Sequence, residues 1–227
     1  MERGVKMKLL INALVKFIFG AVLVGALIFI PAGSMDFFGG WLFMGLLFIP
    51  IFILGIILFV KSPEMLKKRL DSGEKEDAQK TVLALSALVF IAGFVLAGLD
   101  YRFGWTQVPP VLQATASVIF LASYILYAEV MRENAYLSRK IEVQEGQNVV
   151  DTGLYGIVRH PMYMATTLLF LMIPLMLGSL ISLAVFLCFP FILVVRIKNE
   201  EKVLLDGLEG YADYIKKVKY RLIPFIW

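Results

Sequence analysis

Charged and polar side chains gather at the ends of two long apolar stretches late in the sequence. His160 and Tyr163 stand where one stretch begins, and Arg196 and Glu200 follow the end of the next. Arg196 and Glu200 are four residues apart, so a continuous helix places both on one face. A guanidinium matches the geometry of a carboxylate or phosphate, and a carboxylate accepts hydrogen bonds from a cationic ligand. This set of residue types is suited to binding a charged, polar molecule.

The same residues also have a purely structural interpretation. Arg196 and Glu200 would then form an ion pair within one helix, and His160 would cap the helix that Pro161 opens. Tyr163 would belong to the belt of aromatic side chains found at membrane surfaces. The two interpretations differ in whether these residues face a common ligand.

Scarce residue types exclude several other kinds of site. The 227 residues include one His and one Cys, too few for a disulfide framework, a zinc cluster or a Cys–His nucleophile pair. Cys188 lies inside an apolar run and is interpreted as a helix packing residue. No Gly-x-Gly-x-x-Gly follows a predicted strand, so no Rossmann domain is expected. We expect neither a metal nor nucleic acid among the partners.

The elements that must position the polar residues are membrane helices. Hydrophobic residues make up 59% of the chain and charged residues 18%, whereas a soluble domain has about 45–50% and about 25%. Backbone groups in lipid must be satisfied within a segment, so long apolar runs are helices. The sequence therefore predicts an all-α membrane protein with six transmembrane helices, at residues 9–30, 41–60, 82–99, 111–128, 162–178 and 179–195.

The first predicted span begins with basic residues, and the last two predicted spans form a hairpin. Residues 9–30 resemble a cleaved signal peptide, but no small-residue cleavage pattern follows, so we interpret them as a span with Lys16 near the headgroups. Apart from Lys16 the spans hold almost no charge, which disfavours a transporter or proton relay. A tight turn at Gly178 and Ser179 makes the last two spans a hairpin. The open ends of that hairpin bring His160, Tyr163, Arg196 and Glu200 together.

The distribution of basic residues predicts the orientation. With the N-terminus in the cytoplasm, all of the 22 Lys and Arg residues except Arg102 fall on the cytoplasmic side. The positive-inside rule then places both termini and the polar cluster on the cytoplasmic face.

Three polar segments face that side. Ser62-Pro63-Glu64 predicts a short surface helix at the start of residues 61–80. Residues 129–160 form the longest loop. In the third segment, the tail after Arg196, apolar residues recur at three- and four-residue steps, which predicts a C-terminal amphipathic helix. Those residues are Leu204, Leu208, Tyr211, Ile215 and Val218.

The last 95 or so residues resemble a known family. The motif Arg159-His160-Pro161-Met162-Tyr163 is preceded by residues 151–155 (Asp-Thr-Gly-Leu-Tyr) and followed after one hairpin by Arg196 and Glu200-Glu201, and then by a Tyr-x-x-Tyr tail. This arrangement resembles the isoprenylcysteine carboxyl methyltransferase family, to which membrane phospholipid methyltransferases are related. The chain then divides into four N-terminal spans, residues 1–131, and a catalytic region, residues 132–227.

The resemblance implies a cofactor, S-adenosylmethionine, and a set of site residues. Arg196 matches the arginine that the family assigns to its substrate, and Glu200 matches the acidic cofactor contact. The other residues that match cofactor contacts are Gln144, Gln147, Asn148, Val149, Val150, Tyr155, His160, Pro161, Met162 and Tyr163.

The function expected from the resemblance is S-adenosylmethionine-dependent methylation of a lipophilic acceptor taken from the inner leaflet. A prenylated cysteine carboxylate is the leading acceptor, because an arginine fork matches a carboxylate. A phospholipid amine, another lipophilic amine or a small thiol is the alternative. A transporter or structural membrane protein is the alternative outside enzymes.

Overall fold

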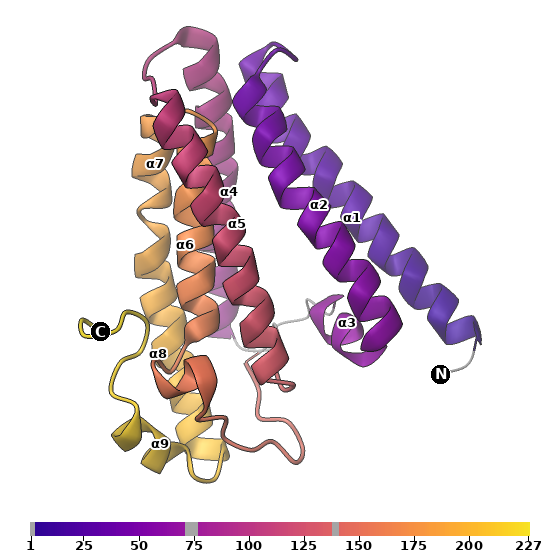
Figure 1. Ribbon diagram of the computed structural model, residues 1–227, viewed down its shortest axis with the longest axis vertical. Coiled ribbons are helices and arrows are strands. Elements are labelled where there is room, and N and C mark those ends of the chain that lie inside the picture. Colours follow the sequence, from indigo (N-terminus) through magenta and orange to yellow (C-terminus); the bar gives the residue numbers. More distant parts are fainter. Residues whose placement is uncertain (1–2, 71–76, 138–140) are drawn as a thin grey trace.

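The computed structural model describes residues 3–70, 77–137 and 141–227, and this part of the chain is helical with no β-strand. Residues 71–76 and 138–140, which include part of the predicted cytoplasmic segments, lie outside the described residues. The described residues form long helices joined by short helices and loops (Figure 1). The elements are α1 (Arg3–Ala32), α2 (Phe38–Lys61), α3 (Pro63–Leu70), α4 (Asp77–Phe103), α5 (Pro110–Glu133), a 3-10 turn η1 (Gly153–Gly156), α6 (Pro161–Met176), α7 (Leu180–Phe186), α8 (Phe189–Gly207) and α9 (Tyr211–Lys217).

Five of these helical stretches are long and apolar enough to cross a membrane. They are α1, α2, α4, α5 and the α7–α8 pair, which forms one stretch over Leu180–Gly207. Large apolar side chains along α1 and α2 are exposed, as a lipid-facing surface requires. The protein is an integral membrane protein.

The fifth predicted span is shorter than expected. Residues 162–178 correspond to α6, which begins one residue earlier, at Pro161, and has 16 residues, a length of about 24 Å at 1.5 Å per residue. This helix falls below the length of a free membrane-spanning helix, so the described residues contain five candidate spans and one shorter apolar helix rather than six equal spans. α6 packs along α5 and α7, and its neighbours cover much of its surface.

The helices converge at one end of the molecule and spread at the other (Figure 1). The turns between α1 and α2, α4 and α5, and α6 and α7 meet at the upper end, which we call the Asp100 end. α1 approaches α4 closely at Gly98, where a Cβ atom would lie 2.5 Å from the Ile28 carbonyl oxygen. Toward the lower end, the α1–α2 pair leans away from the other helices and carries α3.

The largest hydrophobic cluster lies where the helices converge. It combines Phe43 from α2, Phe94 from α4, Phe120 from α5, Ile173 from α6 and Phe186 from α7. Every long helix except α8 contributes to this cluster, so the converging half of the molecule holds its main hydrophobic core.

The prediction of a short helix after Ser62 is confirmed by α3, which Pro63 opens. The single C-terminal amphipathic helix is not seen. α8 ends at Gly207, the chain turns at Gly210 with a φ of 82°, and α9 begins at Tyr211. The apolar residues on which the helix prediction was based pack together with Val143 and Val149 of the long loop instead. Glycine permits the left-handed turn at low cost, so the tail folds back and does not continue as a helix.

Candidate active site

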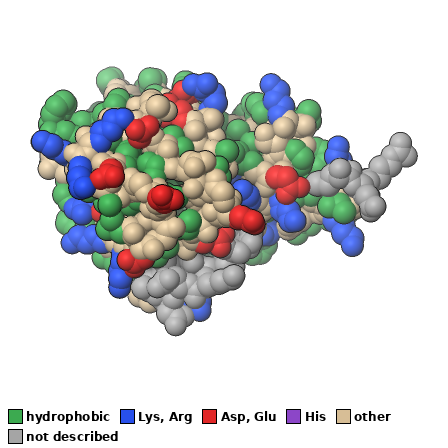
Figure 2. All heavy atoms as spheres, turned by 90° about the horizontal axis from the view of Figure 1, so that it is seen from below, with side chains coloured by type: hydrophobic (Ala, Val, Ile, Leu, Met, Phe, Trp, Pro, Cys, Tyr) green, Lys and Arg blue, Asp and Glu red, His purple; other side chains and the backbone are tan. Residues whose placement is uncertain are grey.

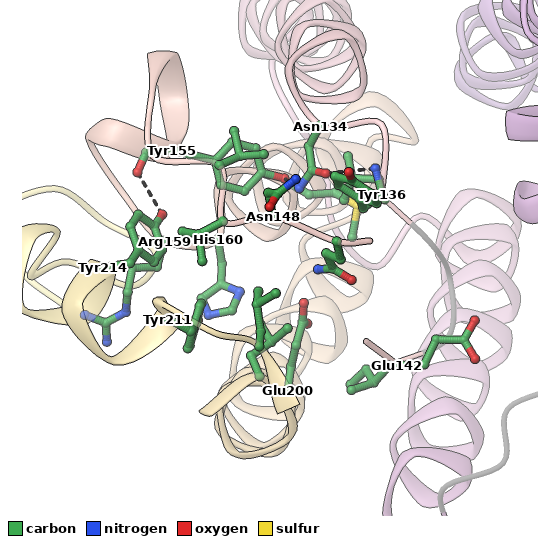
Figure 3. Close-up of a pocket in the computed structure, with 18 of the residues that line it drawn as sticks. Asn134, Tyr136, Glu142, Asn148, Tyr155, Arg159, His160, Glu200, Tyr211 and Tyr214 are labelled. Atoms are coloured by element: carbon green, nitrogen blue, oxygen red, sulfur yellow. Dashed lines mark hydrogen bonds between the residues drawn. The ribbon is translucent and has the colours of Figure 1, made fainter. Parts of the chain in front are cut away.

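A cavity lies at the end of the molecule opposite Asp100, between the first turn of α6, the second half of α8, α9 and the long loop (Figure 3). We call this end the cavity end. The cavity and its mouth, which is open to solvent, together contain about 830 Å³ of space that no protein atom fills. Its lining residues are Asn134, Tyr136, Leu137, Ile141, Glu142, Gln147, Asn148, Val149, Val150, Tyr155, Arg159, His160, Met162, Tyr163, Arg196, Glu200, Leu204, Leu208, Tyr211 and Tyr214.

A tyrosine hydroxyl joins the arginine and the glutamate of α8. The Tyr163 Oη atom donates to Glu200 Oε2 at 2.5 Å and accepts from Arg196 Nε at 2.9 Å. Tyr163 and Arg196 are buried, whereas Glu200 is partly exposed toward the cavity. The link fixes a cationic fork and a carboxylate at neighbouring positions on one wall.

The next glutamate has a different role. Glu201 is buried and accepts from Arg159 Nε and Arg221 Nε, each at 2.7 Å. The His160 ring lies 3.4 Å from the same carboxylate. Consecutive residues on a helix point about 100° apart, so Glu200 borders the cavity while Glu201 faces the arginines behind it. His160 is the N-cap residue of α6, and its ring belongs to the cluster around Glu201.

The Glu201 cluster also anchors the C-terminal tail. The Arg159 guanidinium donates to the carbonyl oxygens of Val218 and Lys219 at 2.8 and 3.0 Å. The backbone N–H groups of Arg159 and His160 donate to the carbonyls of Tyr220 and Arg221. Residues far apart in the sequence are thereby held side by side, and the tail becomes part of the wall behind the cavity.

η1 closes another side of the cavity. The Leu154 N–H donates to both Glu133 carboxylate oxygens, at 3.0 and 3.2 Å. Gly153, with a φ of 54°, leaves room for that carboxylate, because a Cβ atom would overlap the Glu133 Oε1 atom. Asn134 donates to the Tyr155 hydroxyl at 3.1 Å. The Tyr214 hydroxyl donates to the Tyr155 carbonyl at 2.8 Å (Figure 3).

The polar part of the loop is held by its own amides and by α3. The Gln144 N–H donates to the Gln147 side-chain oxygen at 2.9 Å. The Gln144 side chain donates to the Tyr136 carbonyl and accepts from Lys68 Nζ at 2.6 Å. Gln144 therefore lies behind the cavity wall and connects it to α3, while Gln147 and Asn148 border the cavity.

One polar atom of the wall has no partner. The Tyr211 hydroxyl is buried, and no group in the described part of the chain forms a hydrogen bond with it. Burial, together with the negative charges of Glu201 and Glu200, raises the pKa of Tyr211. The hydroxyl therefore stays protonated at neutral pH and can donate to a molecule in the cavity. Buried polar atoms without partners are rare and call for an explanation such as a ligand.

The structure places most of the predicted site residues around this one cavity. Gln147, Asn148, Val149, Val150, Tyr155, His160, Met162, Tyr163, Arg196 and Glu200 line it. Gln144 and Pro161 do not: Gln144 supports the loop, and Pro161 is buried at the start of α6. Whether these residues bind a cofactor stays a prediction.

Sequence reasoning missed several residues of the wall. Tyr211 and Tyr214 were visible only as a Tyr-x-x-Tyr pattern, and nothing in the sequence marked Asn134, Tyr136 or Glu142. Among the described residues, no group of three or more His, Cys, Asp or Glu side chains could hold a metal ion.

The comparison with known families concerns the part of the chain that carries this geometry. Residues 114–206, from the first turns of α5 to the end of α8, match the isoprenylcysteine carboxyl methyltransferase (ICMT) family. We call residues 114–206 the ICMT-family region because they match that family. The region includes the loop, the α6 entry, Arg196 and Glu200, and ends before Tyr211.

The chain is also similar to a curated bacterial protein, the uncharacterized protein YpbQ of Bacillus subtilis strain 168. The two sequences are 33% identical over 92 residues, which is 40% of this chain and 55% of YpbQ. The chain thus matches about half of that protein's length. The helices α1 to α4 lie outside the ICMT-family region.

Proposed function

We propose that the protein is an S-adenosylmethionine-dependent methyltransferase that methylates a carboxylate of a lipophilic acceptor, of which a prenylated cysteine is the leading example. The observation that carries the proposal is the link from Arg196 through Tyr163 to Glu200 on the cavity wall. It provides one group for an anionic acceptor and one for a cationic cofactor at adjacent positions. The ICMT-family region that contains all three residues supports it.

The residues around the cavity have the chemistry that this cofactor requires. S-adenosylmethionine has a cationic sulfonium, a zwitterionic amino acid, a ribose diol and a flat adenine. Glu200 offers a carboxylate, Gln147 and Asn148 offer amides, and the unpartnered Tyr211 hydroxyl offers a donor. Val149, Val150, Leu204 and Leu208 provide apolar surface.

The bound cofactor supplies an activated methyl group on sulfur. The task of the protein is to hold the acceptor oxygen in line with that group, because proximity and alignment supply most of the acceleration. Arg196 orients a carboxylate through its fork, and Tyr163 keeps Arg196 and Glu200 in a constant relation. A carboxylate is already ionised at neutral pH, so no general base is required.

We place the cavity end at the cytoplasmic face, open to the inner leaflet. Basic residues predominate in the segments at this end, and Figure 2 shows Lys and Arg side chains around the edge of this face with acidic ones nearer its middle. Basic residues flanking membrane helices favour the cytoplasmic side. Glu145 is exposed on the loop beside the cavity and can report the orientation.

The orientation is tested with Glu145→Cys in a Cys188→Ala background. An impermeant thiol reagent should label this variant in inside-out vesicles and leave it unlabelled in intact cells. The Cys188→Ala protein without the new cysteine is the control. Labelling from the outer face would overturn the orientation.

Cofactor use is tested by calorimetric titration of the detergent-purified protein with S-adenosylhomocysteine. No binding at millimolar ligand would overturn the methyltransferase proposal. The acceptor is tested by mass spectrometry after incubation with methyl-labelled S-adenosylmethionine and either S-farnesyl-N-acetylcysteine or membrane lipids. Label in the farnesylated carboxylate is the expected result, and label in a phospholipid amine would replace the proposed acceptor class.

A further inference from the structure

A second arginine reaches the first turn of α6 from a helix that lies outside the ICMT-family region. Arg69 belongs to α3, which the α1–α2 pair carries. Its guanidinium carbon lies 5.3 Å from the centroid of the Tyr127 ring on α5. Its Nη2 atom lies 3.7 Å from the sulfur of Met162, which lines the cavity. Arg69 thus bridges α3 to the helices that form the site.

Two guanidinium groups therefore flank consecutive residues of α6. Arg69 contacts Met162, and Arg196 donates to the hydroxyl of Tyr163. Met162 and Tyr163 both line the cavity. An anionic group bound at this turn would lie within the influence of positive charge from two different helices.

Arg69 is partly buried, and its contacts leave one buried donor atom unused. Its Nε atom is buried, and no acceptor in the described ranges forms a hydrogen bond with it. The thioether of Met162 is a weak acceptor, and the Tyr127 ring offers a cation–π contact. A buried N–H group without an acceptor is unfavourable, and an anionic ligand would provide the acceptor that the Arg69 Nε atom lacks.

The charge of Arg69 acts on the cavity wall. Burial raises the pKa of Tyr155, and the positive charge of Arg69 acts in the opposite direction. Lys68, the preceding residue, donates to Gln144 at 2.6 Å and so ties the same helix to the loop of the site. α3 is consequently placed to take part in binding.

We infer that Arg69 binds the anionic group of the lipophilic acceptor, as a second guanidinium in addition to Arg196, and so makes the site select a carboxylate over its neutral ester. This inference rests on the proposed function for the identity of the acceptor. It assigns a binding role to the N-terminal half of the protein, which supplies α3 to the site. The acceptor head then lies beside Met162, between α3 and the entry of α6.

The test compares a carboxylate with its neutral ester in the full-length protein. The protein is reconstituted in phosphatidylcholine nanodiscs with excess S-adenosylhomocysteine, and the affinities for S-farnesyl-N-acetylcysteine and its methyl ester are measured. A hydrogen bond to a charged group is worth about 1.5–3 kcal/mol, or roughly ten- to a hundredfold in affinity. The wild-type protein should prefer the acid by at least about tenfold, and Arg69→Gln should keep only the part of that preference that Arg196 provides.

Two further variants separate binding from structure. Arg69→Lys should retain part of the preference, because it keeps the charge but not the fork. Lys67→Gln removes an exposed positive charge from the same helix and should leave the preference unchanged. A purely structural role of Arg69 would lower the melting temperature of Arg69→Gln and weaken acid and ester equally.

The outcomes also distinguish this inference from the proposed function. If the wild-type protein binds S-adenosylhomocysteine and prefers the acid, but Arg69→Gln discriminates as well as wild type, only the role of Arg69 is overturned. If the wild-type protein binds S-adenosylhomocysteine but does not discriminate acid from ester, the carboxylate acceptor and the role of Arg69 both fail, while cofactor binding stands. If S-adenosylhomocysteine does not bind, the proposed function itself fails.

Discussion

The two ends of the molecule use buried polar groups in different ways. At the Asp100 end, the Asp100 carboxylate accepts from the Thr106 N–H at 2.7 Å and from Ser179 Oγ at 2.5 Å, and also from the Thr106 hydroxyl. At the cavity end, two buried polar atoms, the Tyr211 hydroxyl oxygen and Arg69 Nε, have no hydrogen-bond partner among the described residues.

The difference distinguishes a structural network from a binding site. Asp100 joins the loop after α4 to the turn that begins α7. The carboxylate accepts hydrogen bonds from groups of the protein itself, and the Thr106 hydroxyl in turn accepts from the Leu180 N–H. A satisfied buried network specifies a conformation, whereas an incomplete one is unstable until a ligand completes it. Substitutions at the first end should therefore change stability, and substitutions at the second should change binding.

The largest effect is expected from Asp100→Ala. It removes the common acceptor of three donors, and each buried donor left unpaired costs about 1–3 kcal/mol. The melting temperature in detergent should fall steeply, while the folded fraction still binds S-adenosylhomocysteine. Asp36→Ala, at an exposed loop position of the same end, is the control and should change little. An unchanged melting temperature for Asp100→Ala would contradict the structural role.

Arg196→Lys should reduce turnover by roughly a hundredfold, because an ammonium cannot replace the fork and a charged hydrogen bond is worth about 1.5–3 kcal/mol. Cofactor affinity should change little, the pattern of an interaction that matters mainly in the transition state. Turnover is measured with S-farnesyl-N-acetylcysteine and affinity with S-adenosylhomocysteine. If affinity falls in parallel with turnover, Arg196 serves the cofactor, and the case for a carboxylate acceptor loses its main support.

Glu200→Gln should weaken S-adenosylhomocysteine binding by about ten- to a hundredfold. The amide still accepts from the Tyr163 hydroxyl, so the fold should remain intact, but the negative charge at the cavity is lost. Calorimetry measures the affinity. Glu209→Gln changes an exposed glutamate nearby in the tail and should bind as wild type does. Equal affinities for the two variants would remove Glu200 from the site.

The smallest and most selective effect is expected from a pair of tyrosines. Tyr211→Phe removes a hydroxyl with no partner among the described residues, so it should lower S-adenosylhomocysteine affinity by about two- to tenfold without lowering the melting temperature. Tyr214→Phe removes the bond to the Tyr155 carbonyl and should lower the melting temperature first. The opposite pattern in the two variants would mean that Tyr211 does not face the ligand.

Sequence reasoning was most successful where a pattern is local. Long apolar runs predicted membrane helices, Ser62-Pro63 predicted α3, and the turn at Gly178 predicted that the ends of α6 and α8 meet. It was least successful in the tail, where a helical spacing extended past Gly207 and Gly210. The same spacing arises there because separate elements pack into one cluster with Val143 and Val149.

The sequence by itself determined which residues are apolar, which polar types stand at the ends of the last helices, and that His160, Tyr163, Arg196 and Glu200 are neighbours. Only the tertiary structure decided that Tyr163 bridges Arg196 and Glu200, that Glu201 turns away to hold Arg159 and Arg221, and that α3 brings Arg69 to Met162. The physical reason is that helical periodicity relates residues within about one turn of each other. Contacts between Arg69 and Met162, or Arg159 and Val218, depend on how whole helices and the folded tail pack together.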